Sequence, residues 1–359
     1  MHKRYLKSCK KKILFIILPN LDTNSPIKGA IALANYLIKK IDVRIISIRK
    51  PSNNNQINKK IKIYFLNKNN FLSKFFLMKK IIYKYKNYRI HTLSFCFSAD
   101  LMNLLIKKKV HLTSTSVRGN LKKNYHNTYG FIGIIISYLH YYIISKIKLI
   151  FSMNKEMFNV IHKLTKKKSI IAGNCIDENN YKKYFIKQKK YLHKIIFLGS
   201  LDKRKNPELA IEGYTKALEK FPKSKLIVLG NGPLLKKILK FKEDFKLKNL
   251  KLLGHKKNPI NYLVKSDLLI CTSKSEGISR SILEALFLGI PVMTSNIDGS
   301  NKIIKNYKNG YVFNNVDEFK NMLPKILKWS KKLSKKRSSL LPNFLTQKVV
   351  SEVYYKNLK

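Results

Sequence analysis

The chain has 359 residues, 45% of them hydrophobic, with 74 Lys or Arg against 19 Asp or Glu, so its formal net charge is +55. This length exceeds the usual size of one hydrophobic core, and the hydrophobic content excludes general disorder. The basic excess indicates contact with a polyanion such as nucleic acid, acidic lipid or a phosphorylated ligand. Because the lysines are spread along the whole chain, compositional bias is the alternative explanation.

The first apolar run, Ile13–Leu18, follows a basic stretch, as the apolar region of a signal peptide would. It is shorter than the roughly 7–15 residues of such a region and ends at Pro19, so it predicts a buried first strand instead. The four cysteines form no CxxC pair, which disfavours a zinc site and indicates reduced, cytosolic thiols. They are Cys9, Cys96, Cys175 and Cys271.

The rest of the first half predicts an α/β alternation. The helix expected first is Ile27–Lys40. The apolar stretch Gly130–Ile144 is shorter than the roughly 20 residues that span a bilayer, and it predicts a buried helix, with a helix in a membrane interface as the alternative. The further strands expected are Val43–Ile48, Thr92–Phe97, Val110–Thr115 and Lys148–Met153.

The second half alternates more clearly between apolar runs and helical patterns, which indicates a parallel, doubly wound sheet. Its clearest helix, Pro207–Phe221, opens with proline at a first-turn position. The expected strands are Lys194–Gly199, Lys225–Gly230, Asn249–Gly254, Asp267–Thr272 and Pro291–Ser295.

Two such halves predict two Rossmann-like domains that face each other across a cleft, where ligands bind at the carboxyl edges of the strands. We expect an amino-terminal Rossmann-like domain over residues 1–180 and a carboxyl-terminal Rossmann-like domain over residues 181–340. Residues 341–359 form a last helix with a narrow apolar stripe, which we expect to pack back on the first domain.

The stretch SEGISRSILEALFLGIPV, residues 275–292, predicts an anion site. Gly277 gives the loop conformational freedom, Ser279 is a suitable N-cap, and Gly289 with Pro291 ends the helix. The free amides of the first turn and the positive end of the helix dipole favour phosphate.

Two acids flank this helix start, and seven residues separate them. Glu276 precedes the helix and Glu284 lies on it. Because carboxylates only accept hydrogen bonds, they suit the hydroxyls of a nucleotide-sugar, one carboxylate for the transferred sugar and one for the ribose. The alternative explanation is that the two glutamates have this spacing by chance and that Glu284 lies on a solvated helix face.

In these residues the sequence resembles the retaining glycosyltransferases of the GT-B fold, the family 4 group with an E-x7-E motif. Four further segments resemble motifs of that family in the expected order. They are IIAGNCIDENNY (170–181), FLGSLDKRKNPELAI (197–211), VLGNGPL (228–234) and NYKNGYVF (306–313).

The resemblance implies that residues 1–180 form the acceptor-binding domain and residues 181–340 the nucleotide-sugar-binding domain, and it implies a role for each candidate residue. Lys205 would pair with the donor diphosphate, Glu276 would contact the transferred sugar and Glu284 the ribose, with Glu276, Lys205 and Arg118 as the catalytic set. The amides of Gly277, Ile278 and Ser279 would assist the phosphates. The remaining residues expected at the donor are Gly199, Ser200, Arg204, Asn231 and Arg280.

The sequence departs from the family pattern at several positions. Ser200 stands where an arginine is usual, so Arg204 or Arg280 would supply that charge. Asn206 replaces a glycine. On the acceptor side, where a histidine often follows the fourth strand, the candidates are Arg118, Asn120 and His126.

The resemblance implies an enzyme that transfers a sugar from a UDP- or GDP-sugar to a hydroxyl of a glycan or lipid-linked saccharide with retention of configuration. Bacterial surface polysaccharide or lipopolysaccharide synthesis is the expected pathway. We expect no cofactor, metal or nucleic acid, and a cytoplasmic protein, with peripheral attachment to the anionic inner face of the plasma membrane as an option. The alternatives are a nucleic-acid-binding basic protein and a catalytically inactive sugar-nucleotide-binding protein.

Overall fold

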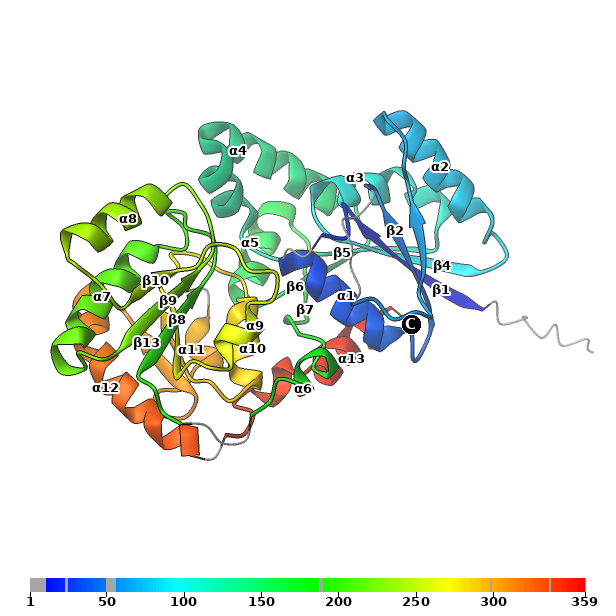
Figure 1. Cartoon of the computed structure of the whole chain (residues 1–359). Helices are drawn as coiled ribbons and strands as arrows, with labels where there is room; N and C mark the ends of the chain where they lie inside the picture. The colour runs from blue at the N-terminus through cyan, green and yellow to red at the C-terminus, as the bar shows by residue number, and fades with distance from the viewer. Residues whose placement is uncertain are drawn as a thin grey trace, which may run out of the picture.

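A computed structural model describes residues 11–22, 25–49, 56–186, 190–297, 299–335 and 337–358. It contains two parallel sheets, each covered by helices on both faces, that lie side by side (Figure 1). The expected α/β architecture with two doubly wound sheets is therefore present.

The first sheet has seven strands in the order β3-β2-β1-β4-β5-β6-β7. Its strands are β1 (Lys12–Leu18), β2 (Asp42–Ser47), β3 (Lys62–Phe65), β4 (Arg89–Ser94), β5 (Leu112–Ser116), β6 (Leu149–Ser152) and β7 (Ile170–Ile171). Its helices are α1 (Ser25–Leu37), α2 (Phe71–Tyr83), α3 (Phe97–Leu105), the 3-10 helix η1 (Lys107–Lys109), α4 (Leu121–Ser145), α5 (Lys155–Thr165) and α6 (Asn179–Lys182).

The second sheet has six strands in the order β10-β9-β8-β11-β12-β13. Its strands are β8 (Lys194–Leu198), β9 (Lys225–Leu229), β10 (Leu250–Leu252), β11 (Leu268–Cys271), β12 (Val292–Ser295) and β13 (Gly310–Phe313). Its helices are α7 (Pro207–Lys220), α8 (Leu235–Asp244), α9 (Ile260–Leu263), α10 (Arg280–Phe287), α11 (Ser300–Ile303) and α12 (Val316–Lys335). The 3-10 helix η2 (Asn343–Leu345) and α13 (Gln347–Asn357) end the chain.

Strands whose apolar residues are consecutive lie at the centres of the two sheets. All residues from Ile13 to Leu18 of β1 are buried, as are all four residues of β11. Both strands are covered on two faces, which explains why their sequences do not alternate. The sequence did not reveal β3, β7 or β13, which are short and lie at or next to the sheet edges.

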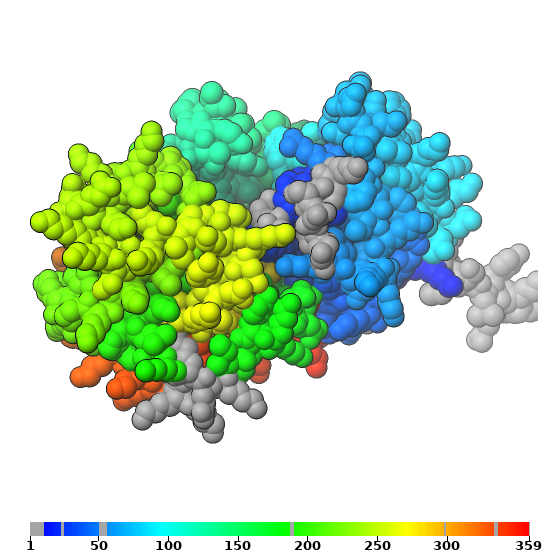
Figure 2. Space-filling model, viewed as in Figure 1, coloured from blue at the N-terminus to red at the C-terminus, as the bar shows by residue number. Residues whose placement is uncertain are grey.

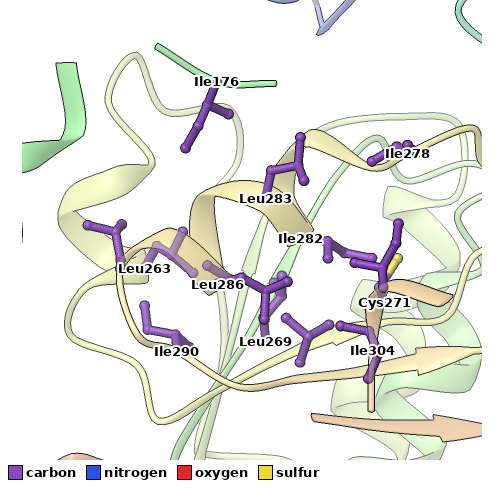
Figure 3. Packing of buried hydrophobic residues seen from close by; sticks show 14 of the residues in the cluster. Ile176, Leu263, Leu269, Cys271, Ile278, Ile282, Leu283, Leu286, Ile290 and Ile304 are labelled. Atoms are coloured by element: carbon purple, nitrogen blue, oxygen red, sulfur yellow. The ribbon is translucent and has the colours of Figure 1, made fainter. Parts of the chain in front are cut away.

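Helix α10 is held by the core of the second half. Ile282, Leu283 and Leu286 point from the helix into a cluster that contains Leu269 of β11 and Ile304 (Figure 3). The helix ends at Gly289, whose φ of +72° is a left-handed conformation that favours glycine. Packing therefore fixes the position of the loop that precedes this helix.

The carboxyl-terminal helix α13 returns to the first half and packs beside α1 (Figure 1). Val350, Tyr354 and Leu358 are buried in the core cluster that contains α1 and β1. The Tyr354 hydroxyl lies 2.8 Å from Ser116 Oγ at the end of β5. The last helix thus ties the end of the chain to the first sheet.

The strand order reverses beside β1 and β4 in the first sheet and beside β8 and β11 in the second. In open parallel sheets, ligands bind outside the carboxyl ends of the strands at such a reversal. The loops that follow β8 and β11 are therefore the first place to search for a site.

Candidate active site between the two sheets

A cleft of about 780 Å³ lies between the two halves, which meet face to face in Figure 2. The first half contributes Ser25, Pro26, Arg118, Met153, Asn174 and residues from the start of α4. The second half contributes Asp202, Lys203, Arg204, Pro233, Leu234, Glu276, Gly277 and Ile278. Cations and hydrogen-bonding groups from both halves thus face one space.

The loops after β8 and β11 are bonded to each other. The Thr272 hydroxyl donates to the carbonyl oxygens of Lys205 and Asn206, at 3.2 and 2.7 Å. The Lys274 amide donates to the Arg204 carbonyl oxygen at 2.8 Å. These bonds hold the segment that carries Arg204 and Lys205 against the segment that carries Glu276.

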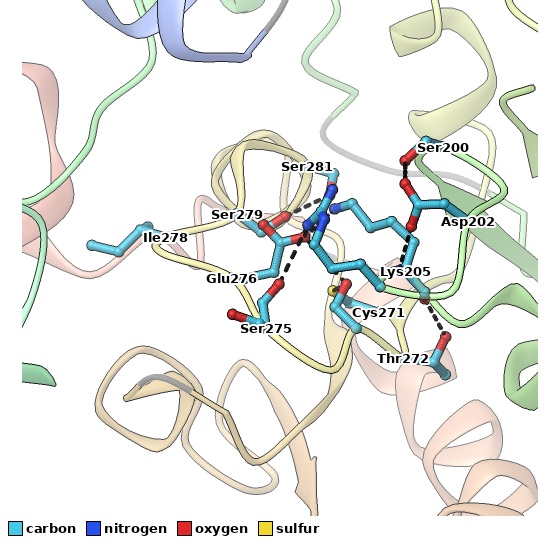
Figure 4. Close-up of polar contacts among 12 residues, drawn as sticks. Ser200, Asp202, Lys205, Cys271, Thr272, Ser275, Glu276, Ile278, Ser279 and Ser281 are labelled. Atoms are coloured by element: carbon cyan, nitrogen blue, oxygen red, sulfur yellow. Dashed lines mark hydrogen bonds and ion pairs between the residues drawn. The ribbon is translucent and has the colours of Figure 1, made fainter. Parts of the chain in front are cut away.

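A cluster of one carboxylate and two cations lies at the cleft wall, where Glu276 and Arg204 line the cleft and Lys205, which is not a lining residue, pairs with Glu276. Glu276 Oε1 accepts hydrogen bonds from Arg204 Nη1 at 2.8 Å and from Ser273 Oγ at 3.2 Å, and it forms an ion pair with Lys205 Nζ. Figure 4 shows the Lys205 and Glu276 side chains pointing toward one another. Burial by itself would raise the pKa of Glu276, but the charges and hydrogen bonds of Lys205 and Arg204 hold it below its ordinary value. Glu276 is therefore ionised, and the cluster carries one net positive charge.

Two glycines allow the loop after β8 to lie close to its neighbours. A Cβ at Gly199 would lie 3.3 Å from the Lys205 side-chain methylenes, so this glycine leaves room for that side chain. A Cβ at Gly230 would lie 1.7 Å from the Gly199 carbonyl oxygen, and its φ is +150°. Gly230 therefore sets the distance between the loops after β8 and β9.

Asn206 has a left-handed backbone with φ +49° directly before Pro207, the first residue of α7. Glycine adopts this conformation most readily, and asparagine is the side chain that tolerates it best. The conformation accounts for Asn206 at a position where the resemblance leads one to expect glycine.

Glu284 lies in a second polar cluster and is buried, so it is not on a solvated face. Its Oε1 accepts hydrogen bonds from the Tyr181 hydroxyl at 2.7 Å and from Arg280 Nε at 3.0 Å. Lys28 of α1 lies near this pair; burial lowers its pKa, the charge of Glu284 opposes that shift, and Arg280 adds to it. A ligand that reaches Glu284 must share or replace these partners.

Arg118 connects the two halves through Asn174. Arg118 Nη1 donates to Asn174 Oδ1 at 2.8 Å, and Asn174 Nδ2 donates to the Ile278 carbonyl oxygen at 3.0 Å. A Cβ at Gly277 would lie 2.8 Å from Met153 Sδ of the first half. The loop between Glu276 and α10 is thus packed directly against the first half.

The other expected site residues are more scattered. Ser200 Oγ donates to Asp202 Oδ2 at 2.5 Å, and Asp202 Oδ1 accepts from the Lys205 amide at 2.8 Å. Asn120 is the N-cap of α4 and accepts from the Lys123 amide at 3.1 Å, while His126 lines the cleft.

Two further residues expected at the donor, Ser279 and Asn231, do not line the cleft. Ser279 occupies the N-cap position of α10 without a side-chain cap, and its hydroxyl lies 3.0 Å from Ser281 Oγ. Asn231 is exposed, and its carbonyl oxygen accepts from the Leu201 amide at 3.0 Å. Neither side chain is among the residues that line the cleft.

Sequence reasoning missed several residues of this region, among them Asn174, Tyr181 and Asp202. Asn174 and Tyr181 stand in the segment 170–181, and Asp202 stands between Ser200 and Lys205. Their positions within the motifs could therefore have identified them as site residues. Among the residues that the structure describes, no group of three or more His, Cys, Asp or Glu side chains could hold a metal ion. Cys96, Cys175 and Cys271 are free thiols, and Cys9 lies outside the described residues.

Residues 176–340, which carry α10 and both glutamates, match the protein family described as "Glycosyl transferases group 1". These residues, slightly less than half of the chain, are similar to the glycosyl transferases group 1 family. An uncharacterized glycosyltransferase of Methanocaldococcus jannaschii is 26% identical over 72% of this chain and 70% of its own length.

Two further relatives match a smaller part of the chain. The UDP-Gal:alpha-D-GlcNAc-diphosphoundecaprenol alpha-1,3-galactosyltransferase of Escherichia coli is 31% identical over 42% of this chain and 41% of its own length. The poly(glycerol-phosphate) alpha-glucosyltransferase of Bacillus subtilis is 35% identical over 33% of this chain and 18% of its own length. The chain therefore spans less than half of these two proteins.

Solved structures match the whole chain. Anabaena HepE in complex with UDP and glucose aligns over 96% of this chain and 98% of its own, with a TM-score of 0.73 and 12% identity. Staphylococcus aureus TarM aligns over 97% of each chain with a TM-score of 0.69 and 13% identity. The GT-B fold that the sequence predicted is confirmed.

Proposed function

We propose that the protein transfers a sugar from a nucleoside-diphosphate sugar to a hydroxyl of a glycan or lipid-linked saccharide with retention of configuration. The observation that carries this proposal is the Lys205–Arg204–Glu276 cluster, which lies at the strand-order reversal in the part of the chain that matches the glycosyl transferases group 1 family. A net positive, partly enclosed site beside a hydrogen-bond acceptor suits a diphosphate joined to a sugar.

On the donor side, Lys205 and Arg204 bind the diphosphate, and Arg204 supplies the charge that Ser200 lacks. Arg204 suits this role better than Arg280, because Arg204 lines the cleft while Arg280 is enclosed with Glu284. Glu276 accepts from hydroxyls of the transferred sugar, and Glu284 accepts from the ribose after exchange with Tyr181. The backbone amides of Gly277 and Ile278 donate further hydrogen bonds to the phosphates.

The chemical step breaks the bond between the anomeric carbon and the diphosphate oxygen. Negative charge then accumulates on the departing diphosphate, and Lys205 and Arg204 stabilise it in the transition state. The acceptor hydroxyl attacks on the face that the diphosphate leaves, and its proton passes to a diphosphate oxygen. Arg118 and His126, from the opposite wall, orient the acceptor.

The acceptor belongs to bacterial surface polysaccharide or lipopolysaccharide synthesis. Support comes from the E. coli relative, whose name includes a diphosphoundecaprenol-linked acceptor, and from the B. subtilis relative, whose name includes poly(glycerol-phosphate). The HepE structure contains UDP and glucose, so UDP-sugars are the donors to test first.

A donor screen tests the proposal. UDP-, GDP- and other nucleotide sugars are added at increasing concentration, and thermal unfolding is followed; a true donor at about 100 times its dissociation constant adds roughly 2.7 kcal/mol. Donors that stabilise are incubated with saccharide acceptors, and the anomeric configuration of the product is read by NMR. Stabilisation without turnover on any acceptor would favour the inactive binding protein, and an inverted product would refute retention.

A further inference from the structure

Helix α4 carries an apolar face that is not covered by the rest of the described chain. Six of its large side chains are 48–75% exposed, and they recur at the spacing of one helical face. They are Phe131, Ile132, Ile135, Tyr138, Leu139 and Tyr142, which we call the α4 face. The sequence predicted a buried helix here; that prediction is wrong for this face.

The other side of α4 is anchored in the protein. His140 Nε2 lies 2.8 Å from Asp100 Oδ2, and its Nδ1 lies 3.0 Å from the Tyr125 hydroxyl. Tyr141 and Ile144 are buried against α5 and β6. The helix is thus half core and half surface.

The geometry excludes a simple membrane span. By length and composition alone, α4 passes as one candidate span among the described residues, with a third of its apolar window buried. It breaks at Gly130, which has non-helical φ and ψ. The part after the break, at 1.5 Å per residue, is about 22 Å long, whereas the hydrocarbon core of a bilayer is about 30 Å thick.

The surroundings of the α4 face are strongly basic. Between residues 71 and 148 the sequence contains fourteen Lys and Arg and a single acid, Asp100, which is buried with His140. Lys122, Lys123 and Lys146 are exposed near the two ends of the helix. A partner for this face must therefore be apolar and negatively charged at once.

A second apolar side lies on α2, where Phe71, Leu72, Phe76 and Tyr83 are exposed. Figure 1 shows α2, α3 and α4 along the upper edge of the first half, and Figure 2 shows α4 and α2 as the two upper projections. η1, which consists of three lysines, follows α3.

We propose that the α4 face docks on the surface of an anionic lipid bilayer, with its apolar side chains in the interface and the surrounding lysines on the headgroups. Tyr138 and Tyr142 place a ring in the apolar region and a hydroxyl in water, as interfacial aromatic residues do. The lysines extend their amines to phosphate while their stems cover apolar surface. A second copy of the chain fits less well, because a twofold contact would set like charges against each other.

Vesicle co-sedimentation tests the proposal with the full chain. We expect binding to vesicles of phosphatidylcholine with 30% phosphatidylglycerol, about tenfold weaker binding to phosphatidylcholine alone, and weakening between 0.1 and 0.5 M NaCl. The triple variant Ile132→Ser, Ile135→Ser, Leu139→Ser should lose about tenfold or more in partitioning. The matched control Leu239→Ser, Phe245→Ser, Phe344→Ser removes exposed apolar side chains elsewhere and should stay within about twofold.

Circular dichroism and donor-sugar binding show whether each variant is folded. If the triple variant does not fold, Ile135→Cys labelled with a polarity-sensitive dye replaces it, and we expect a blue shift on anionic vesicles that a dye at Leu239→Cys lacks. Equal partitioning of the two triple variants, or no blue shift, overturns the proposal. A dimer in sedimentation velocity that the triple variant abolishes also overturns it, in favour of a second copy.

The proposal does not rest on sugar transfer. Donor hydrolysis in solution, without vesicles, should be the same in the triple variant and in the control. Loss of vesicle binding with intact hydrolysis therefore concerns the docking face alone, while absent hydrolysis in all proteins concerns the proposed function.

Discussion

Replacing Lys205 by methionine removes one cation from the cluster on Glu276 and keeps most of the side-chain volume. The cluster then changes from one net positive charge to neutral. A unit charge about 4 Å from a diphosphate oxygen contributes about 4 kcal/mol at an effective dielectric constant of 20. Removal of one such donor to a developing anion commonly costs 10²–10³ in kcat, about 2.7–4 kcal/mol. We therefore expect kcat/KM for donor turnover to fall by about 10²–10³.

The same change should affect folding much less. Glu276 keeps Arg204 at 2.8 Å and Ser273 at 3.2 Å, so its carboxylate is not left without partners. We expect a loss of about 1–3 kcal/mol in the free energy of unfolding, measured by urea titration.

The assay is release of nucleoside diphosphate from the donor identified in the screen, with and without acceptor. Lys216→Met is the matched control, because Lys216 is exposed on α7 and pairs with Glu219 away from the cleft. A Lys205→Met protein that is folded and turns over donor within about threefold of the unchanged protein would refute the role assigned to this cluster.

Three further predictions test the geometry of the cleft. Asn174→Ala removes both hydrogen bonds that join Arg118 to the loop before α10. It should lower the free energy of unfolding by about 1–3 kcal/mol and raise the KM for donor, and an unchanged urea midpoint would contradict this. Gly230→Ala should lower the free energy of unfolding by more than about 3 kcal/mol, because the added Cβ would meet the Gly199 carbonyl oxygen. Gly199→Ala should lower it by under about 1.5 kcal/mol but reduce donor turnover, because the added Cβ would displace the Lys205 side chain. Thermal unfolding and donor turnover are measured for both variants, and similar melting temperatures would be inconsistent with these loop contacts. Because the pKa of Glu276 is lowered in the folded protein, its contribution to stability is present above its ordinary pKa, near pH 4.5, and is lost as the pH falls through the folded value. The Glu276→Gln variant should therefore lose less stability than the unchanged protein below about pH 4.5. Identical acid unfolding profiles of the two proteins would argue against the ion pairs.

Much of the fold follows from local patterns. Runs such as Ile13–Leu18 and Leu268–Cys271 are apolar on consecutive positions, which indicates strands covered on both faces. The helix around Leu283 could be placed, with its end at Gly289, because cap chemistry and helical spacing depend on a few neighbouring residues. The order of motifs then identified the fold and the region of the site.

Tertiary structure decided which of these residues meet. Arg204 and Glu276 are 72 positions apart, and Tyr181 and Glu284 are 103 apart. Arg204 and Glu276 meet because β11 lies beside β8, while β9 and β10 lie on the other side of β8. Local periodicity contains no information about that order.

The two faces of α4 show the same division between sequence and structure. The sequence determined that the stretch from Gly130 to Ile144 contains an apolar helix, because that depends on propensity and spacing within one segment. Only the packing of His140 against Asp100 decided which side faces the core, and so left Ile135 and Leu139 exposed. Both sides of the helix are apolar, so their sequences look alike, and contact with distant parts of the chain distinguishes them.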